Sequence, residues 1–162
     1  MEHKEEFELI ALLLEKGLTI STAESCTGGM VAARLTSVSG ASGAFPFGAV
    51  TYCNDAKHKV LGVSAETLEA FGAVSEKTAE EMALGVRKIM GADIGVSVTG
   101  VAGPNPSEGK PVGLVFVGVS SDAYSAVLEN HFSGDRESVR KQAADIALRL
   151  ALHAAEQTEA KP

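Results

Sequence analysis

Ser25 lies in a short polar segment whose residue types suit nucleophilic catalysis. The segment reads Thr22-Ala23-Glu24-Ser25-Cys26-Thr27-Gly28-Gly29 and is expected to join a strand to the start of a helix. Such a turn directs backbone N–H groups at one point, which suits a phosphate or an oxyanion. It matches neither the GxGxxG nor the Walker fingerprint, and it lacks the GxSxG elbow. On the pattern alone, a tight turn with Thr27 as the helix N-cap carries at least as much weight.

A second polar group, Tyr52-Cys53-Asn54-Asp55-Ala56-Lys57, stands at the end of the next predicted strand. A lysine held near a serine can act as its base if burial or a cationic neighbour lowers the lysine pKa. Tyr52 could relay the proton. The alternative is a strand end with Asn54 as an N-cap and Lys57 in solvent, and the pattern alone favours it.

A third group follows a short apolar strand and reads Thr99-Gly100-Val101-Ala102-Gly103-Pro104-Asn105-Pro106. Loops at the carboxyl ends of strands are favoured ligand sites in open α/β folds. An ordinary connector rich in glycine and proline is the alternative interpretation.

Two arginines mark the start of the last predicted helix. Arg136 and Arg140 are four residues apart and share a helical face. Together they could grip a phosphate through bidentate hydrogen bonds. Taken alone, a solvated charged face is the favoured interpretation.

Metal binding has little support in the sequence. The histidines form no paired motif such as HExxH, and the two cysteines lack metal-finger spacing; these residues are His3, His58, His131, His153, Cys26 and Cys53. Two cysteines are also a poor disulfide framework, so we expect reduced thiols.

Helices and strands alternate along the chain and must position these groups. Periodicity and capping residues predict helices at 3–16, 30–35, 55–61, 65–71 (capped by Ser64), 76–89 (capped by Ser75) and 137–153. They predict strands at 18–22, 45–52, 94–98, 112–119 and 124–132, with a loop at 99–111. Pro46 favours an edge position or a late start for the second strand. The expected fold class is α/β, a single three-layer domain with a mixed β-sheet flanked by helices.

Length and charge narrow the classes of function. We expect one domain over residues 1–162, with a core from about 7 to 153. The net charge of −7 disfavours a broad nucleic-acid-binding face. The N-terminus lacks an export signal, and no apolar run reaches the length of a membrane span, so we expect a cytoplasmic protein.

Six ordered segments together resemble the C-terminal domain family of the competence/damage-inducible protein CinA. They are 22–29, 50–54 with Lys57, 72–75, 99–104, 110–113 and 132–136, and the resemblance runs from about residue 7 to residue 153. It implies hydrolysis of nicotinamide mononucleotide to nicotinic acid mononucleotide and ammonia, the reaction of the stand-alone family members in pyridine nucleotide salvage. It also implies a small-molecule nucleotide as the partner and no metal or organic cofactor. A homo-oligomer is compatible with a small salvage enzyme.

With this resemblance, Ser25 is expected to attack the amide carbon, with Lys57 as base and Tyr52 as its helper. Backbone N–H groups of Thr27, Gly28 and Gly29 would stabilise the oxyanion, and Arg136 would bind the phosphate. The remaining expected substrate-binding residues are Asn54, Thr99, Gly100, Ala102 and Gly103.

Two alternatives remain open at this stage. Cys26 is a rival nucleophile, because a thiol near a helix N-terminus can have a lowered pKa; Ser25 is favoured because a hydroxyl needs the base more. The protein could also be a non-catalytic nucleotide-binding or interaction module linked to competence and the DNA-damage response, or hydrolyse another amide or phosphate of a related nucleotide.

Overall fold

The computed structural model describes residues 4–162 and contains a five-stranded sheet in the order β2-β1-β3-β4-β5. The strands are β1 (Ile20–Glu24), β2 (Phe47–Val50), β3 (Ile94–Gly100), β4 (Leu114–Ser120) and β5 (Ser125–His131). β1 pairs in parallel with both β2 and β3, whereas β3, β4 and β5 pair antiparallel. The predicted mixed sheet is therefore confirmed, and β2 lies at its edge as Pro46 indicated.

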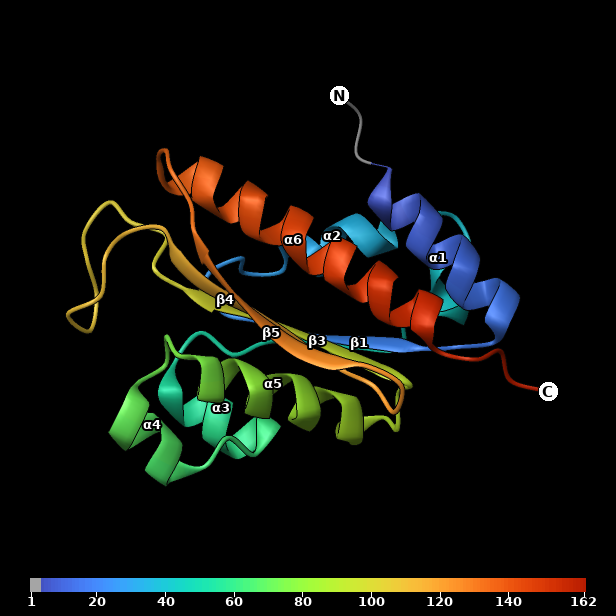
Figure 1. The fold of residues 1–162 in the computed structure, drawn as a ribbon, viewed down its shortest axis with the longest axis horizontal. Coiled ribbons are helices and arrows are strands. Elements are labelled where there is room, and N and C mark those ends of the chain that lie inside the picture. Colours follow the sequence, from blue (N-terminus) through green and yellow to red (C-terminus); the bar gives the residue numbers. More distant parts are fainter. Residues whose placement is uncertain (1–3) are drawn as a thin grey trace.

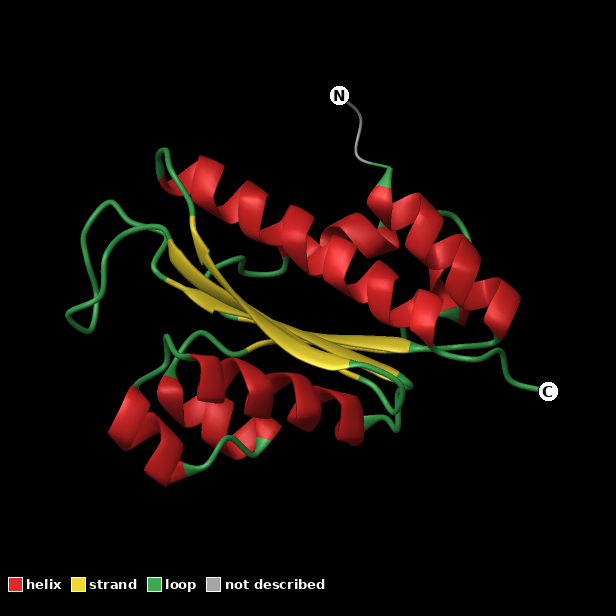
Figure 2. Cartoon of the chain, viewed as in Figure 1, coloured by secondary structure: helices red, strands yellow, loops and turns green. Residues whose placement is uncertain are grey.

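Helices cover both faces of the sheet and complete three layers (Figure 1 and Figure 2). One face carries α1 (Glu5–Lys16), α2 (Met30–Thr36) and α6 (Arg136–Gln157). The other carries α3 (Asn54–Leu61), α4 (Ala65–Phe71) and α5 (Glu76–Ile89). A short 3₁₀ turn, η1 (Ala41–Gly43), precedes β2. The predicted three-layer α/β class is confirmed.

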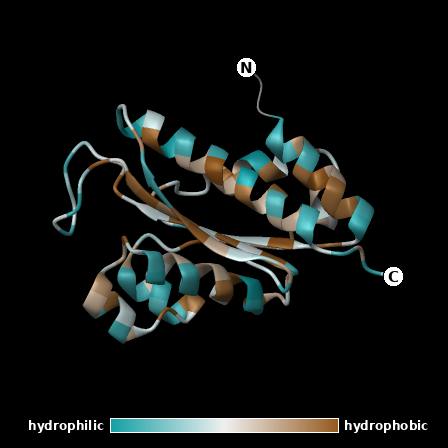
Figure 3. Ribbon diagram, in the orientation of Figure 1, coloured by the Kyte–Doolittle hydropathy of each residue, from teal (hydrophilic) through white to brown (hydrophobic). Residues whose placement is uncertain are grey.

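Apolar strands at the centre explain this arrangement. All seven residues of β4 are buried, as are six of the seven residues of β3. Strands buried on both faces favour continuous β-branched runs over alternation. Figure 3 shows hydrophobic residues along these strands and a mixture of hydrophobic and hydrophilic residues along the helices. The helices therefore cover the sheet with their apolar sides.

Helix caps agree with the sequence in two places and differ in two. Ser64 accepts a hydrogen bond from the Thr67 N–H, and Ser75 accepts one from the Thr78 N–H, as predicted. Thr27 is not the N-cap of α2; that position belongs to Gly29, whose φ of 106° favours glycine. Asn54 is the first residue of α3 rather than its cap.

Several element ends also move relative to the prediction. β1 begins at residue 20 instead of 18, because Thr19 hydrogen-bonds the Asp93 side chain, and it continues through Glu24. β2 is shorter than 45–52, and β3 extends through Thr99 and Gly100, which were predicted as loop. α6 begins at Arg136 and runs to residue 157. The predicted start of the first helix at residue 3 lies outside the described residues.

The connections between strands point to the carboxyl ends of β1 and β2 as a place for a ligand. α2 joins β1 to β2 across one face, whereas α3, α4 and α5 join β2 to β3 across the other. The chain thus leaves the carboxyl end of β1 towards one face of the sheet, and it leaves the carboxyl end of the neighbouring β2 towards the other face. Open α/β sheets bind ligands in the crevice at such a point.

Candidate active site

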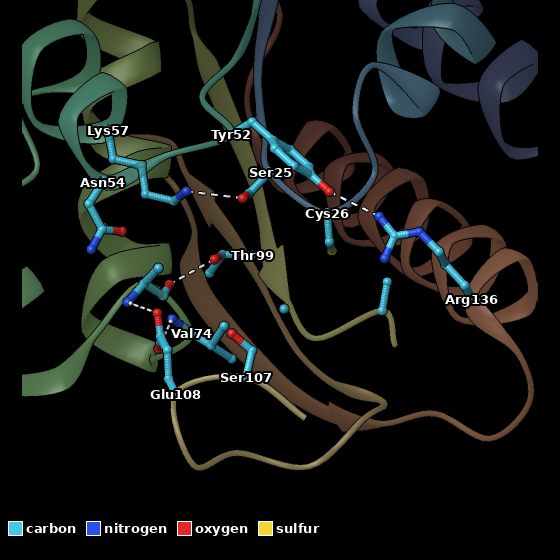
Figure 4. Close-up of a pocket in the computed structure, with 13 residues that line it drawn as sticks. Ser25, Cys26, Tyr52, Asn54, Lys57, Val74, Thr99, Ser107, Glu108 and Arg136 are labelled. Atoms are coloured by element: carbon cyan, nitrogen blue, oxygen red, sulfur yellow. Dashed lines mark hydrogen bonds between the residues drawn. The ribbon is translucent and has the colours of Figure 1, made fainter. Parts of the chain in front are cut away.

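A serine and a lysine meet at the carboxyl end of β1. Ser25 follows β1 directly, and its N–H donates to the Val98 carbonyl at 2.9 Å. Lys57 lies on α3, and its Nζ is 3.0 Å from Ser25 Oγ and 2.7 Å from the Thr51 carbonyl oxygen (Figure 4). The interpretation of Lys57 as a solvated surface lysine is wrong, because only 1% of the residue is exposed.

Burial makes this lysine suited to act as a base. Desolvation lowers the pKa of Lys57 below its ordinary value. No carboxylate of residues 4–162 forms an ion pair with its Nζ. An amine that loses its charge readily can accept the proton of a nearby hydroxyl. The pair thus has the distance and the environment for serine activation.

The turn after Ser25 is built around the carboxylate of Glu24. Glu24 is 1% exposed and accepts hydrogen bonds from the N–H groups of Val31 at 2.8 Å and Ala32 at 3.1 Å. These are amides of the first turn of α2, which are free in an uncapped helix. The protein's own carboxylate therefore occupies the helix end that the sequence suggested for a ligand phosphate.

A cavity of about 240 Å³ opens beside Ser25. Eight predicted site residues line it: Ser25, Tyr52, Asn54, Lys57, Thr99, Gly100, Ala102 and Arg136. Four others do not: Thr27, which is fully buried, Gly28, Gly29 and Gly103. The three polar groups of the sequence therefore converge on one cavity, although part of the glycine turn lies behind it.

Tyr52 and Arg136 lie together on one side of the cavity. Arg136 donates to the Tyr52 hydroxyl at 2.9 Å and to the Gly103 carbonyl. In Figure 4 the Tyr52 hydroxyl points towards Arg136 and away from Lys57. Lys57 thus contacts Ser25 directly, whereas the Tyr52 hydroxyl contacts Arg136. Gly103 takes part through its carbonyl, which holds Arg136.

Arg140 does not accompany Arg136. Its Nε donates to the Cys26 carbonyl at 3.0 Å and its Nη2 donates to the Thr27 carbonyl at 3.1 Å. Arg140 is therefore committed to the backbone of the Ser25 turn, which fits neither the favoured interpretation of a solvated charged face nor the alternative of a two-arginine phosphate grip.

Four cavity residues that sequence reasoning did not name as site residues come from a long loop, with Ser107 and Glu108, and from the turn it contacts, with Ala73 and Val74. Glu108 accepts from the N–H groups of Ala73 at 3.0 Å and Val74 at 3.2 Å. Burial raises its pKa, but these bonds and Lys110 outweigh burial and leave the pKa lowered. Thr99 donates to the Ala73 carbonyl at 2.7 Å, so strand, turn and loop are fastened together. In the sequence, the segment 72–75 was noted only as part of the family resemblance, and no motif or spacing pointed to Glu108.

The rival nucleophile is poorly suited to its role. Cys26 lines the cavity but is only 6% exposed. Burial raises the pKa of its thiol to about 11, opposite to the lowering that the alternative required. A thiol in this state is protonated near neutral pH and is a weak nucleophile.

Residues 4–162 contain no group of three or more His, Cys, Asp or Glu side chains placed to hold a metal ion. No helix in that part of the chain is long and apolar enough to cross a membrane.

The fold and the cavity define an α/β domain with a serine–lysine pair at the carboxyl ends of its parallel strands. The family model of the CinA C-terminal domain matches residues 2–155. The chain belongs to this family.

Solved structures and curated relatives agree with this assignment. Competence/damage inducible protein CihA from Agrobacterium tumefaciens is 40% identical with a TM-score of 0.90, and 97% of this chain and 98% of that chain are covered. A CinA superfamily protein from Klebsiella pneumoniae 700603 is 34% identical with a TM-score of 0.91, at 96% and 98% coverage.

Among curated relatives, the nicotinamide-nucleotide amidohydrolase PncC of Enterobacter agglomerans is 50% identical over 152 residues, which are 93% of each protein. The CinA-like protein of Kosmotoga olearia is 52% identical over 143 residues, 87% of this chain and 35% of that protein. The matched part of the chain spans only 34% to 38% of the length of four curated relatives, the Kosmotoga olearia protein among them.

Proposed function

We propose that the protein is an amidohydrolase that converts nicotinamide mononucleotide to nicotinic acid mononucleotide and ammonia, within cytoplasmic pyridine nucleotide salvage. The observation that carries this proposal is the 3.0 Å contact between Ser25 Oγ and the buried Lys57 Nζ inside the cavity. The relative named for this reaction, covered over 93% of its length, supports the choice of substrate.

The chemistry follows from the two side chains. Neutral Lys57 takes the proton of Ser25 while Oγ attacks the carboxamide carbon, and the carbonyl electron pair moves onto oxygen. The tetrahedral intermediate collapses, the C–N bond breaks, and the protonated lysine supplies the proton that ammonia needs to leave. Water, deprotonated in turn by Lys57, then hydrolyses the ester on Ser25.

Two cavity residues support the placing of the nucleotide. Arg136 lines the cavity and offers a cation to the phosphate. Asn54 lines the same cavity at the start of α3, on the side of Lys57, and offers an amide to the polar groups of the substrate. The phosphate would thus lie on the Arg136 side, with the carboxamide at Ser25.

The test is ammonia release from nicotinamide mononucleotide by the parent protein and two variants. Ser25→Ala should lose turnover by about 10⁴-fold or more while still binding the nucleotide. Cys26→Ala should keep turnover within a few-fold. Loss of activity in Cys26→Ala with retention in Ser25→Ala would reject the nucleophile. Binding by the parent without ammonia release would instead favour the non-catalytic nucleotide-binding module.

A further inference from the structure

Arg140 holds the backbone of the turn that presents Ser25. Its guanidinium donates to two consecutive carbonyl groups, those of Cys26 at 3.0 Å and Thr27 at 3.1 Å. None of the ion pairs found within residues 4–162 involves Arg140. A half-buried cation is thus directed at peptide oxygens beside the nucleophile.

Peptide geometry gives this contact a consequence on the other side of the turn. In a trans peptide the C=O and the N–H point in opposite directions. The Cys26 carbonyl points towards Arg140 on α6, so the N–H of Thr27, in the same peptide group, points away from α6. α3, which carries Lys57, lies on the opposite face of the sheet from α6 (Figure 1). Arg140 thus fixes the direction of the Thr27 N–H from the α6 side of the sheet.

Neighbouring amides of this turn are already committed. The Gly28 N–H donates to the Ser25 carbonyl at 3.1 Å, which closes the turn. The N–H groups of Val31 and Ala32 donate to Glu24. The N–H groups of Cys26, Thr27 and Gly29 make none of the hydrogen bonds found within residues 4–162 and remain as donors. Of these three residues, Cys26 lines the cavity.

We propose that Arg140 is a positioning residue that fixes the Cys26–Thr27 peptide, so that an unpaired amide of the turn after Ser25 stabilises the oxyanion formed when Ser25 attacks. The inference rests on the proposed function and extends it. A cation on the carbonyl also polarises the peptide and strengthens its N–H as a donor. Because the donor is fixed before reaction, it acts on the transition state more than on the bound substrate.

Steady-state kinetics provide the first test. Removing one oxyanion donor costs about 10²–10³ in kcat. In Arg140→Met the amide donor is still present, but no guanidinium holds it in position. We therefore expect kcat to fall about 10- to 100-fold, with KM within about twofold. Arg140→Lys, with one point charge instead of a fork, should lie between the parent and Arg140→Met. Added guanidinium should restore part of the activity of Arg140→Ala.

Arg149→Met is the matched control. It removes an arginine from the same helix whose exposed side chain pairs only with Glu5 among the described residues. Its kcat and KM should match the parent. A rise in KM at unchanged kcat in Arg140→Met would show that Arg140 binds substrate, and would overturn the proposal. Circular dichroism shows whether each variant is folded, and Arg140→Lys takes the place of an unfolded Arg140→Met.

A serine-directed fluorophosphonate separates this inference from the choice of substrate. Ser25 Oγ forms a bond to phosphorus, the P–F bond breaks with loss of fluoride, Lys57 takes the serine proton, and the P=O oxygen occupies the oxyanion position. Intact mass should show one adduct that is absent in Ser25→Ala, with labelling about tenfold slower in Arg140→Met.

The labelling rates separate the role of Arg140 from the proposed function. Slower labelling in Arg140→Met would support the role of Arg140 even if the parent released no ammonia from nicotinamide mononucleotide, in which case only the proposed function fails. Equal labelling rates in the parent and Arg140→Met would overturn the role of Arg140. A parent protein that is not labelled at Ser25 would overturn both the nucleophile and its positioning.

Discussion

In the proposed function, Lys57 contributes to catalysis at a cost in stability. Its side chain is buried against Ser25 and Thr51, and burial of an ammonium group costs free energy that two hydrogen bonds only partly offset. The same burial lowers the pKa and makes the amine available as a base. Such sites commonly trade folding free energy for activity.

Lys57→Met should therefore raise the free energy of unfolding while abolishing turnover. We expect a gain of about 1 kcal/mol at pH 7, measured by urea denaturation. The folded-state pKa is lowered, so the unfolded chain binds more protons between that pKa and the ordinary lysine value of 10.5, and parent stability rises with pH across this window. The advantage of Lys57→Met should shrink as the pH approaches 10.5; an advantage that grows with pH would contradict this account.

The pH profile of turnover should follow the same residue. Only the neutral amine accepts the serine proton, so kcat should rise with pH through the lowered pKa of Lys57 and then level off. Cys26→Ala should leave the profile unchanged up to about pH 10, because the pKa of the Cys26 thiol is raised to about 11. A loss of the rising limb in Cys26→Ala would assign the titration to the thiol.

Individual site residues could be predicted from the sequence, but the contacts of each side chain could not. Ser25, Lys57 and Arg136 have side chains whose chemistry is visible in the sequence, and all three line the cavity. Arg140 has the same side chain as Arg136 and lies one helical turn later, yet it faces a backbone instead of the cavity. Sequence spacing gives the helical face of a side chain, but not which neighbouring segment packs there.

At the scale of elements, the loop after β3 is fastened to the turn between α4 and α5. Glu108 accepts from two amides of that turn, and Lys110 donates to the carbonyls of Phe71 and Val74. Gly72 is required at the contact, since a Cβ there would lie 2.4 Å from the Glu108 carboxylate. The contact joins segments 35 residues apart, which no local pattern could have predicted.

Glu108→Gln should loosen this wall of the cavity. The neutral amide accepts more weakly than a carboxylate, so we expect KM to rise several-fold with a smaller change in kcat, and stability to fall by about 1 kcal/mol. Because the folded-state pKa of Glu108 is lowered, this contribution is present above pH 4.5 and is lost as the pH falls through that pKa. Steady-state kinetics and urea denaturation measure both effects. Glu137→Gln, at an exposed pair with Lys141, is the control and should change neither.

Gly85 sets the distance between α5 and α3. A Cβ at this position would lie 1.8 Å from the Leu61 carbonyl oxygen, which belongs to the last residue of α3. Gly85→Ala should push α3 outward, lower the free energy of unfolding by about 1–3 kcal/mol, and reduce kcat by moving Lys57 away from Ser25. Thermal unfolding and kinetics provide the readout, with exposed Lys88→Ala on the same helix as the control. Unchanged kcat would show that α3 tolerates the shift.

At the scale of the whole molecule, an ion cluster ties together the three helices of one face. Arg34 on α2 pairs with Glu6 on α1 at 2.7 Å and with Asp145 on α6. Burial lowers the pKa of Arg34, but the carboxylates of Glu6 and Asp145 outweigh it and leave the pKa raised. Glu6 is only 5% exposed, so this ion pair is largely shielded from solvent.

Arg34→Met should lower the free energy of unfolding by about 3 kcal/mol, because it leaves a buried carboxylate unpaired. Urea denaturation of this variant against the parent measures the effect. Arg149→Met, which breaks an exposed pair with Glu5, should cost less than about 0.5 kcal/mol. Equal effects of the two variants would show that burial of the cluster adds nothing.

The layers of the fold could be predicted from the sequence, whereas the side-chain contacts between distant segments could not. Helical periodicity and β-branched runs gave the three-layer class and the mixed sheet. The Arg34 cluster, the Arg140 contact and the Glu108 contact each join residues distant in the chain, and all three depend on how helices and loops pack once the sheet has formed.

The position of α6 in the chain order has a consequence for synthesis. Ser25 and Lys57 leave the ribosome before the helix that carries Arg136 and Arg140, since α6 follows all five strands in the chain. A nascent chain that has folded everything else still presents its serine on a turn with no guanidinium behind it. Full activity would therefore require α6 to have emerged and docked, so that the rise of activity during synthesis would time the docking of this helix.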